Sequence, residues 1–470
     1  MFQRNVAQAD RWDSPMMRLN QNTRRQPGSS ASGLPCVILA SACLRAAESL
    51  VRRLSAVYTS VAMAKRYIYV FYLLNLLVLL TGSLSGQSGF VHTSGADLVD
   101  GQGKTLMLRG TNLGNWFEAE GYMFHLGDTA QSPREIEQLS YELIGQEKAD
   151  VFWKQWRDTY ITEADIDRIK AMGFNSVRVP IHWKFFDSEN AEGFRLLDRL
   201  VEWARKDHIY VIIDLHCAPG GQTGTNIDDS DGYPWLYLSP EAQKHTIALW
   251  RGIAAHYAKE PIVLGYDLLN EPIPHFPQLQ RFNPGLEPLY RRMVAAVREV
   301  DPNHTVILGG AQWDSNFKVF GEPFDSNVMY TFHKYWTATD ASVIKEYLDF
   351  RDKYKVPIWL GESGENKDDW VAAFVKTLED NHVGWCFWPY KKMDAPSSEV
   401  TFDRPIHWDA IIALTKMQGG TGNAEKRVAA RPSPEDAQAA FDDLLEKIKF
   451  SNEKVNAGYV HALGLTVAAQ

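Results

Sequence analysis

The chain has 470 residues, enough for one large domain or two of medium size, and its 45% hydrophobic content allows a substantial core. The formal net charge of −9 argues against nucleic acid as a partner, because polyanions are bound by basic stripes. The four cysteines have neither zinc-ligand spacing nor the density of a disulfide scaffold, and the sequence predicts no metal and no cofactor.

Residues 63–86 have the pattern of a secretory signal peptide. Lys65 and Arg66 precede a 14-residue apolar run at 67–80, and small residues follow the run. The run is shorter than the roughly 20 residues of a bilayer-spanning helix, so a retained membrane anchor is the less favoured alternative. We therefore expect a secreted, extracellular or periplasmic protein without a stable membrane span after cleavage.

A signal peptide belongs at the start of a chain, yet 62 residues precede this one. We hypothesise that translation starts at Met63. Residues 1–62 would then be a start-site artefact, and otherwise an unstructured extension.

Short apolar runs alternate with helical patterns over most of the remaining chain. Two strands at 90–93 and 96–99 predict a hairpin. The runs that follow predict βα units and a parallel sheet. The expected strands are 105–110, 175–180, 210–216, 263–270, 305–310, 328–335, 358–362 and 384–390.

Eight βα units within residues 87–450 predict an α/β fold, a (β/α)8 TIM barrel with an N-terminal hairpin. The long segments 112–160 and 217–239 are expected to be loop insertions on the functional face. A doubly wound sheet is the alternative fold. It would place a Gly-rich phosphate loop after its first strand, and the sequence has none there.

The C-terminal region predicts one further helix. Ser433 and Pro434, followed by two acidic residues, form a strong helix start, and an apolar stripe follows them. We expect this helix to pack on the outside of the barrel after a flexible connector at 418–432. Residues 451–470 are predicted to form a C-terminal tail.

Polar residues end most of the predicted strands, and the active site of a TIM barrel lies at those carboxyl ends. Asn270 and Glu271 end the fourth strand, and Glu362 ends the seventh. Such a ring suits a hydrolase that binds a neutral polymer and uses two carboxylates. The remaining polar or aromatic residues of the ring are Arg178, His216, His333, Tyr335 and Trp388.

Six of these segments resemble, in order and spacing, the signature strands of glycoside hydrolase family 5, the large cellulase family. They are RVPIHW at 178–183, DLHCAPGGQ at 214–222, LLNEP at 268–272, FHKYW at 332–336, WLGESG at 359–364 and WCFWPY at 385–390. RGTNLGNWFE at 109–118 also resembles the exo-β-1,3-glucanase branch. The resemblance implies a glycosidase that acts on a β-linked polysaccharide or oligosaccharide.

The resemblance also implies roles for single residues. Glu271 would be the general acid/base and Glu362 the nucleophile. The implied substrate-binding residues are Arg178 and Tyr335 beside the nucleophile, Asn270 at the sugar 2-hydroxyl group, His216 and His333 flanking the catalytic pair, and Trp388 as the floor under the reactive sugar. Because side chains alternate along a strand, Trp385 and Trp388 cannot both face the barrel interior.

The chemistry of glycoside cleavage explains the two acids. With retention of configuration, one carboxylate attacks the anomeric carbon and one carboxylic acid protonates the leaving oxygen, the two lying about 5–5.5 Å apart. Arg178 is expected to keep Glu362 ionised, because a nearby cation favours the charged form. Partial burial and the charge of Glu362 are expected to raise the pKa of Glu271.

Several alternatives stay open at this point. Endo or exo action on glucan, hydrolysis of β-mannan and cleavage of aglycone β-glycosides all occur in this family. A metal-dependent barrel hydrolase would have a His-x-His motif where Thr111 and Asn112 stand, and a non-catalytic carbohydrate-binding barrel would not need both acids. Glu365 is predicted to be a surface acid, and Cys217 and Cys386 to be free thiols on strands that are not neighbours.

Overall fold

The computed structural model describes residues 89–188, 191–417 and 421–467. The predicted signal peptide and the extension before it lie outside these residues. Among the helices of the described residues, none is both long and apolar enough to cross a membrane.

Eight parallel strands close into a barrel, which confirms the predicted fold class. Most of the strands are buried along their whole length, because the barrel interior covers one face and helices cover the other. In barrel order the strands are β10 (Gly384–Phe387), β3 (Arg109–Asn112), β4 (Ser176–His182), β5 (Tyr210–Cys217), β6 (Val263–Asp267), β7 (Thr305–Gly309), β8 (Val328–His333) and β9 (Ile358–Glu362).

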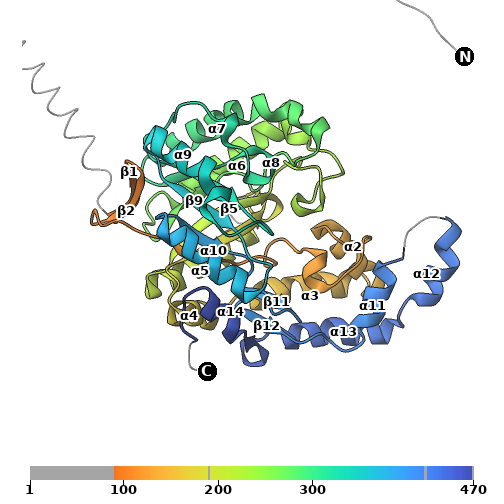
Figure 1. Ribbon diagram of the computed structural model, residues 1–470. Coiled ribbons are helices and arrows are strands. Elements are labelled where there is room, and N and C mark those ends of the chain that lie inside the picture. The colour runs from red at the N-terminus through yellow and green to blue at the C-terminus, as the bar shows by residue number, and fades with distance from the viewer. Residues whose placement is uncertain (1–88, 189–190, 418–420, 468–470) are drawn as a thin grey trace, which may run out of the picture. The chain divides into compact units, whose positions relative to one another are not determined.

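Helices between the strands form the outer layer of the barrel (Figure 1). The connection between β7 and β8 holds the four-residue element α8 (Ala311–Asp314). The longer helices are α4 (Glu163–Met172), α5 (Glu192–Asp207), α6 (Pro240–Tyr257), α7 (Asn283–Arg298), α9 (Lys345–Tyr354) and α10 (Asp368–Asp380).

An antiparallel hairpin precedes the barrel, as predicted, and is formed by β1 (Gly89–Ser94) and β2 (Asp97–Gly101). Its side chains Val91 and Leu98 belong to one apolar cluster with residues of the barrel strands such as Ile307 and Trp359. The first barrel strand begins later than the predicted 105–110, because Thr105 pairs with Val99 of the hairpin instead.

The long segment 112–160 is not only loop. It contains α2 (Pro133–Ile144) and α3 (Gln146–Thr159), and α13 (Pro434–Lys447) packs against both. The predicted start of α13 is confirmed, since the Ser433 side chain accepts a hydrogen bond from the backbone N–H of Asp436. Figure 1 shows these three helices side by side, together with α11 (Trp408–Thr415).

Two boundaries near the C-terminus need correction. The predicted flexible connector contains a helix, α12 (Ala424–Ala430). The predicted tail contains β13 (Lys454–Val455), which pairs with β12 (Val400–Phe402), and α14 (Ala457–Ala462), which packs on α10. The packed region therefore extends beyond residue 450.

Candidate active site

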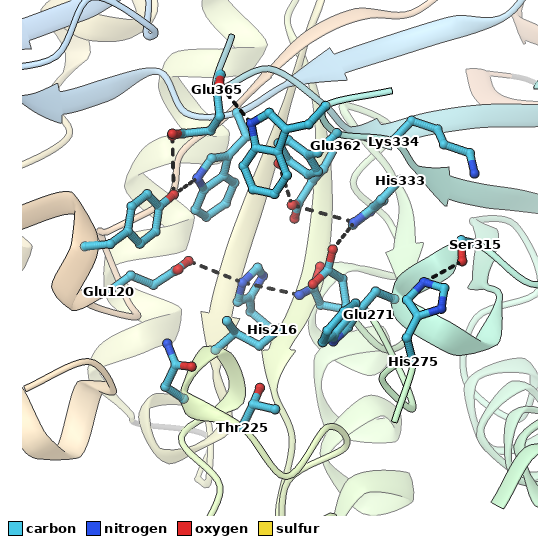
Figure 2. A pocket seen from close by; sticks show the side chains of 18 of the residues that line it. Glu120, His216, Thr225, Glu271, His275, Ser315, His333, Lys334, Glu362 and Glu365 are labelled. Atoms are coloured by element: carbon cyan, nitrogen blue, oxygen red, sulfur yellow. Dashed lines mark hydrogen bonds and ion pairs between the residues drawn. The ribbon is translucent and has the colours of Figure 1, made fainter. Parts of the chain in front are cut away.

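A cavity of about 840 Å³ lies at the carboxyl ends of the barrel strands. Seven of the eight residues with predicted roles line it. The eighth, Arg178, contacts one of the lining residues, Glu362. Both predicted insertions also contribute, through Glu120, Tyr122 and Gln131 of one and residues 225–227 of the other. Figure 2 shows the acidic, imidazole and aromatic side chains converging on this space.

Glu362 ends β9 and is held by two donors. The Arg178 Nη1 atom lies 2.6 Å from its Oε1 atom, and the Tyr335 hydroxyl donates to Oε2 at 3.0 Å. The residue is buried, with 5% of its surface exposed. The two contacts place a guanidinium and a phenol beside this carboxylate, as the family resemblance implies.

Arg178 is itself completely buried in β4 and contacts several acceptors. Its guanidinium lies 2.9 Å from Asp267 and 3.0 Å from Asp214, and it donates to Asn270 Oδ1 at 2.9 Å. Burial raises the pKa of Asp214 and of Asp267 to about 7, although the charge of Arg178 opposes the rise. Arg178 is thus a structural ion-pair centre and a partner of Glu362 at once.

Glu271 follows β6 in a left-handed backbone conformation, with φ at 47°. Its Oε1 atom lies 3.0 Å from His333 Nδ1, and its backbone N–H donates to Asp314 at 3.1 Å. Burial raises the pKa of Glu271, and the predicted further rise from the charge of Glu362 is not found. The nearest imidazole carries no charge, because burial lowers the pKa of His333 to about 3.

The two acids face one another across the cavity. One carboxylate oxygen of Glu271, one of Glu362 and a ring nitrogen of His333 all lie within 4.8 Å of one another. Residues 91 positions apart in the chain are therefore brought to a single point, as strands four and seven of a barrel predict. A water-separated inverting pair would stand about 6.5–9.5 Å apart.

Trp388 and His216 form the adjacent wall. Their rings stack with centroids 5.5 Å apart and an interplanar angle of 12°, and Trp388 Nε1 donates to the Tyr122 hydroxyl at 2.7 Å. Trp385 lies in the hydrophobic core, which confirms the predicted alternation. Burial lowers the pKa of His216 to about 4, so this imidazole is also uncharged.

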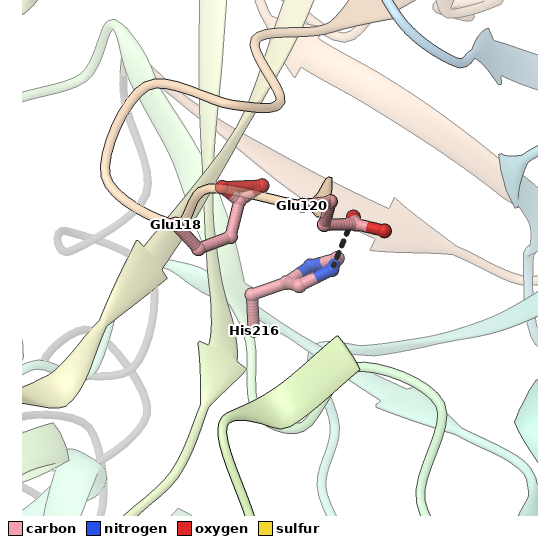
Figure 3. A group of neighbouring side chains, drawn as sticks. All are labelled: Glu118, Glu120 and His216. Carbon is pink, nitrogen blue, oxygen red and sulfur yellow. Dashed lines mark ion pairs between the residues drawn. The ribbon is translucent and has the colours of Figure 1, made fainter. Parts of the chain in front are cut away.

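The structure brings in acids that the sequence did not assign. Glu365, predicted to be a surface acid, lines the cavity and forms a 2.8 Å ion pair with the buried Lys392. Glu118 and Glu120 lie beside His216 (Figure 3), and burial raises the pKa of both carboxyl groups. Their position in an insertion without a repeating pattern gave no signal of this contact.

Among the residues that the structure describes, two groups of side chains have donor atoms close enough for a metal ion: Glu271 with His333 and Glu362, and Glu118 with Glu120 and His216. Hydrogen bonds already engage the first group, and Glu118 accepts the backbone N–H of Asn115 through both oxygens. Cys217 and Cys386 are buried free thiols, as predicted.

The fold and the site together define a class, the TIM-barrel enzymes with a paired-carboxylate centre. The family model "Cellulase (glycosyl hydrolase family 5)" matches residues 135–394. The chain belongs to this family, which confirms the resemblance seen in the sequence.

Curated relatives carry several names. A beta-xylosidase of Phanerodontia chrysosporium is 30% identical, over 60% of this chain and 59% of that protein, so the chain spans less than two thirds of this relative's length. A glucan 1,3-beta-glucosidase of Candida oleophila is 29% identical, over 68% and 78%. Endoglucanase C of Acetivibrio thermocellus is 26% identical, over 52% and 88%.

A solved structure supports the fold. The rutinosidase of Aspergillus niger has a TM-score of 0.50 and 20% identity, and the match covers 61% of this chain and 90% of that one.

Proposed function

We propose that the protein is a retaining glycoside hydrolase that cleaves β-glucosidic bonds in polysaccharides or oligosaccharides. The observation that carries the proposal is the approach of the Glu271 and Glu362 carboxylates to within 4.8 Å, which suits direct attack on the anomeric carbon. The same pair on one rim argues against a non-catalytic sugar-binding barrel.

The reaction has two displacements. Glu362 forms a bond to the anomeric carbon while the bond to the leaving oxygen breaks, and Glu271 gives its proton to that oxygen. In the second step Glu271 takes a proton from water, whose oxygen attacks the anomeric carbon and releases Glu362. The surroundings fit these roles, because Glu362 contacts a cation and Glu271 contacts a neutral imidazole.

The remaining predicted residues would serve the sugar in the reactive position. Trp388 presents an indole ring to the cavity, and Asn270, next to Glu271, points its side chain toward both Arg178 and His216. Glu120, 6% exposed, adds acceptor oxygens 3.8 Å from His216 for sugar hydroxyl groups. We further propose release of sugars from chain ends, supported by relatives named glucan 1,3-beta-glucosidase and beta-xylosidase.

Azide rescue tests the assignment of both acids. With an activated aryl β-glucoside, azide should restore Glu362→Ala as an α-glucosyl azide and Glu271→Ala as a β-glucosyl azide, because azide replaces either the nucleophile or the incoming water. The matched control is Glu202→Ala, an exposed acid on α5, which should keep full activity. Initial release of the α-anomer by the unaltered enzyme would contradict retention.

A substrate panel tests the linkage. Product sizes from β-1,3-glucan, β-1,4-glucan, β-mannan and xylo-oligosaccharides separate the named alternatives. Monosaccharide as the first product supports action at chain ends, whereas a ladder of oligosaccharides would overturn it.

We also propose that the enzyme acts outside the cytoplasm. The signal-like segment 63–86 supports this, and N-terminal sequencing of the native protein tests it. A native product that keeps the segment would contradict cleavage.

A further inference from the structure

Asp314 is a buried acid with no role in the mechanism described above. It belongs to α8, directly after the short segment that leaves β7, and none of its surface is exposed. Its Oδ2 atom accepts the backbone N–H of Glu271 at 3.1 Å and lies 3.3 Å from His333 Nε2. One oxygen therefore touches the acid/base residue and its imidazole neighbour.

The backbone that presents Asp314 is strained. Gln312, Trp313 and Asp314 are consecutive residues with φ near +55° to +59°. Each non-glycine residue in the left-handed region costs on the order of 1–2 kcal/mol. Gln312 is held by a two-way amide pair with Asn283, at 2.9 and 3.0 Å. Strain that surroundings maintain is typical of positions that serve a site.

The turn also delivers side chains to the cavity on both sides of Asp314. Trp313 and Ser315 line the cavity, and the Ser315 hydroxyl lies 3.2 Å from His275 Nε2 (Figure 2). Space for the Asp314 carboxyl group exists because residue 309 is glycine. A Cβ atom on Gly309 would lie 1.9 Å from Asp314 Oδ1.

The contact with His333 bears on its tautomer. A neutral imidazole has one N–H group, which sits on either Nδ1 or Nε2. Within the described part of the chain, the buried Nε2 atom has no aligned hydrogen-bond partner, so Asp314 Oδ2 is the acceptor at hand. With the N–H on Nε2, Nδ1 presents a lone pair to the Glu271 Oε1–H group 3.0 Å away. That tautomer stabilises Glu271 in its protonated form.

Asp314 makes both contacts through a single acceptor oxygen, Oδ2. Burial raises the pKa of Asp314 well above its ordinary value. Asparagine has the same shape and the same acceptor, so it should replace the residue without loss.

We propose that Asp314 is a positioning residue for the acid step, which fixes both the backbone of Glu271 and the Nε2–H tautomer of His333. This inference rests on the proposed function, with Glu271 as the proton donor. It assigns the strained turn after β7 to the leaving-group side of the reaction.

A leaving-group series tests the proposal. Proton donation matters for glycosides with alkyl or sugar leaving groups and little for dinitrophenyl glycosides, whose leaving group departs unprotonated. Asp314→Ala should lower kcat/KM for an alkyl glycoside on the order of 10- to 100-fold, and for the dinitrophenyl glycoside about twofold or less. Asp314→Asn should match the unaltered enzyme on both substrates.

Gly309→Ala offers a second route to the same effect, because the new methyl group displaces the Asp314 side chain. Gly252→Ala on α6, where an added Cβ meets no atom within 4 Å, is the matched control. An equal loss on both substrates for Asp314→Ala, or an Asp314→Asn variant as impaired as Asp314→Ala, would overturn the inference.

The Glu271→Ala variant distinguishes a failure of the inference on Asp314 from a failure of the proposed function. Its kcat/KM should fall strongly for the alkyl glycoside and little for the dinitrophenyl glycoside. If it does and Asp314→Ala does not, the inference on Asp314 fails alone. If Glu271→Ala loses both activities equally, the proposed function fails as well.

Discussion

The two sides of the cavity carry the same carboxyl group in opposite surroundings. Glu362, at the end of β9, contacts the guanidinium of Arg178 from β4 and the hydroxyl of Tyr335, which follows β8. On the side formed by β6 and β8, Glu271 contacts the uncharged ring of His333. The difference between the two sites is the guanidinium of β4, since the end of β8 supplies Tyr335 to one acid and His333 to the other.

The difference has a geometric source. Arg178 lies in the middle of β4, where its side chain points into the barrel and reaches the end of β9 from below. Glu271 lies beyond the end of β6, in the left-handed conformation that turns it toward the cavity. One acid is therefore anchored to β4 from inside the barrel, and the other to the last residue of β8 and to the turn that contains Asp314.

Removing the cation should have the largest effect. Arg178→Met leaves Asp214 and Asp267 buried without their partner, and we expect a loss of about 3–5 kcal/mol in the free energy of unfolding at pH 8. Activity should fall on the order of 10³-fold. Urea unfolding and initial rates measure both. The stability loss should be smaller at pH 5, where both aspartates, with pKa values of about 7, are protonated.

The surface pair Arg195–Asp158 is the control for that experiment. Arg195 is 47% exposed in its side chain, and its replacement by Met should cost less than about 1 kcal/mol. Equal costs at the two sites would break the contrast between the buried and the exposed cation.

A buried acid outside the cavity, Glu399, should make the stability of the protein depend on pH. Glu399 is fully buried before β12, and burial raises its pKa to about 8 from an ordinary 4.5. Glu399 therefore favours the folded state of the wild-type protein when its carboxyl group is protonated. This contribution to the free energy of unfolding is fully present below pH 4.5 and is lost as the pH rises through 8. Glu399→Gln should gain on the order of 3 kcal/mol over wild type between pH 5 and pH 8.

Chemical unfolding at a series of pH values measures this gain. The exposed Glu202→Gln variant should show a flat difference over the same range. A pH-independent difference for Glu399→Gln would mean that the carboxyl group is not titrating in the folded protein.

A smaller loss is expected from the phenol on the nucleophile side. Tyr335→Phe removes the 3.0 Å hydrogen bond to Glu362 Oε2 and should lower kcat/KM roughly 10- to 100-fold. Tyr257→Phe removes a similar bond, to Asp198 on the outer helices, and should leave the rates unchanged. Steady-state kinetics on one aryl glucoside compares the two, and equal rates would show that Glu362 does not need the phenol.

The smallest effect on activity should come from the hydrogen bond between Trp388 and Tyr122 in the cavity wall. Tyr122→Phe removes the acceptor of the Trp388 indole N–H, a 2.7 Å bond, and should raise KM about two- to tenfold with little change in kcat. A change in kcat with constant KM would instead place this bond on the reaction pathway.

The barrel could be predicted from the sequence because its strands and helices are marked by periodic and local residue patterns. Strand β9 has the predicted bounds, and the other strand ends fall within a few residues, since apolar runs and helix starts mark them. The paired acids were found because they end such strands in a signature order. The hairpin and the C-terminal helix followed from equally local patterns, and the two free thiols followed from the order of the strands in the barrel.

The parts that could not be predicted depend on partners far along the chain. Glu365 reads as a surface acid until β11 (Lys391–Met393) brings Lys392 beside it. Asp314 follows a strand by several residues and shows its contact with Glu271 only when the left-handed turn is seen. Glu120 depends on an insertion whose path has no periodic signal.

Glu453 joins the last part of the chain to elements made much earlier. Its carboxylate pairs with Lys391 of β11 and with Arg168 of α4, and all three side chains are nearly inaccessible to solvent. During synthesis on the ribosome, Arg168 gains its ion pair with Glu453 only after the final segment has emerged, whereas Lys391 already has Asp165 of α4 as a partner. Proteolytic removal of that segment would leave Arg168 without this carboxylate and Lys391 with Asp165 as its remaining acidic partner, so a clipped chain should be less stable than the intact one.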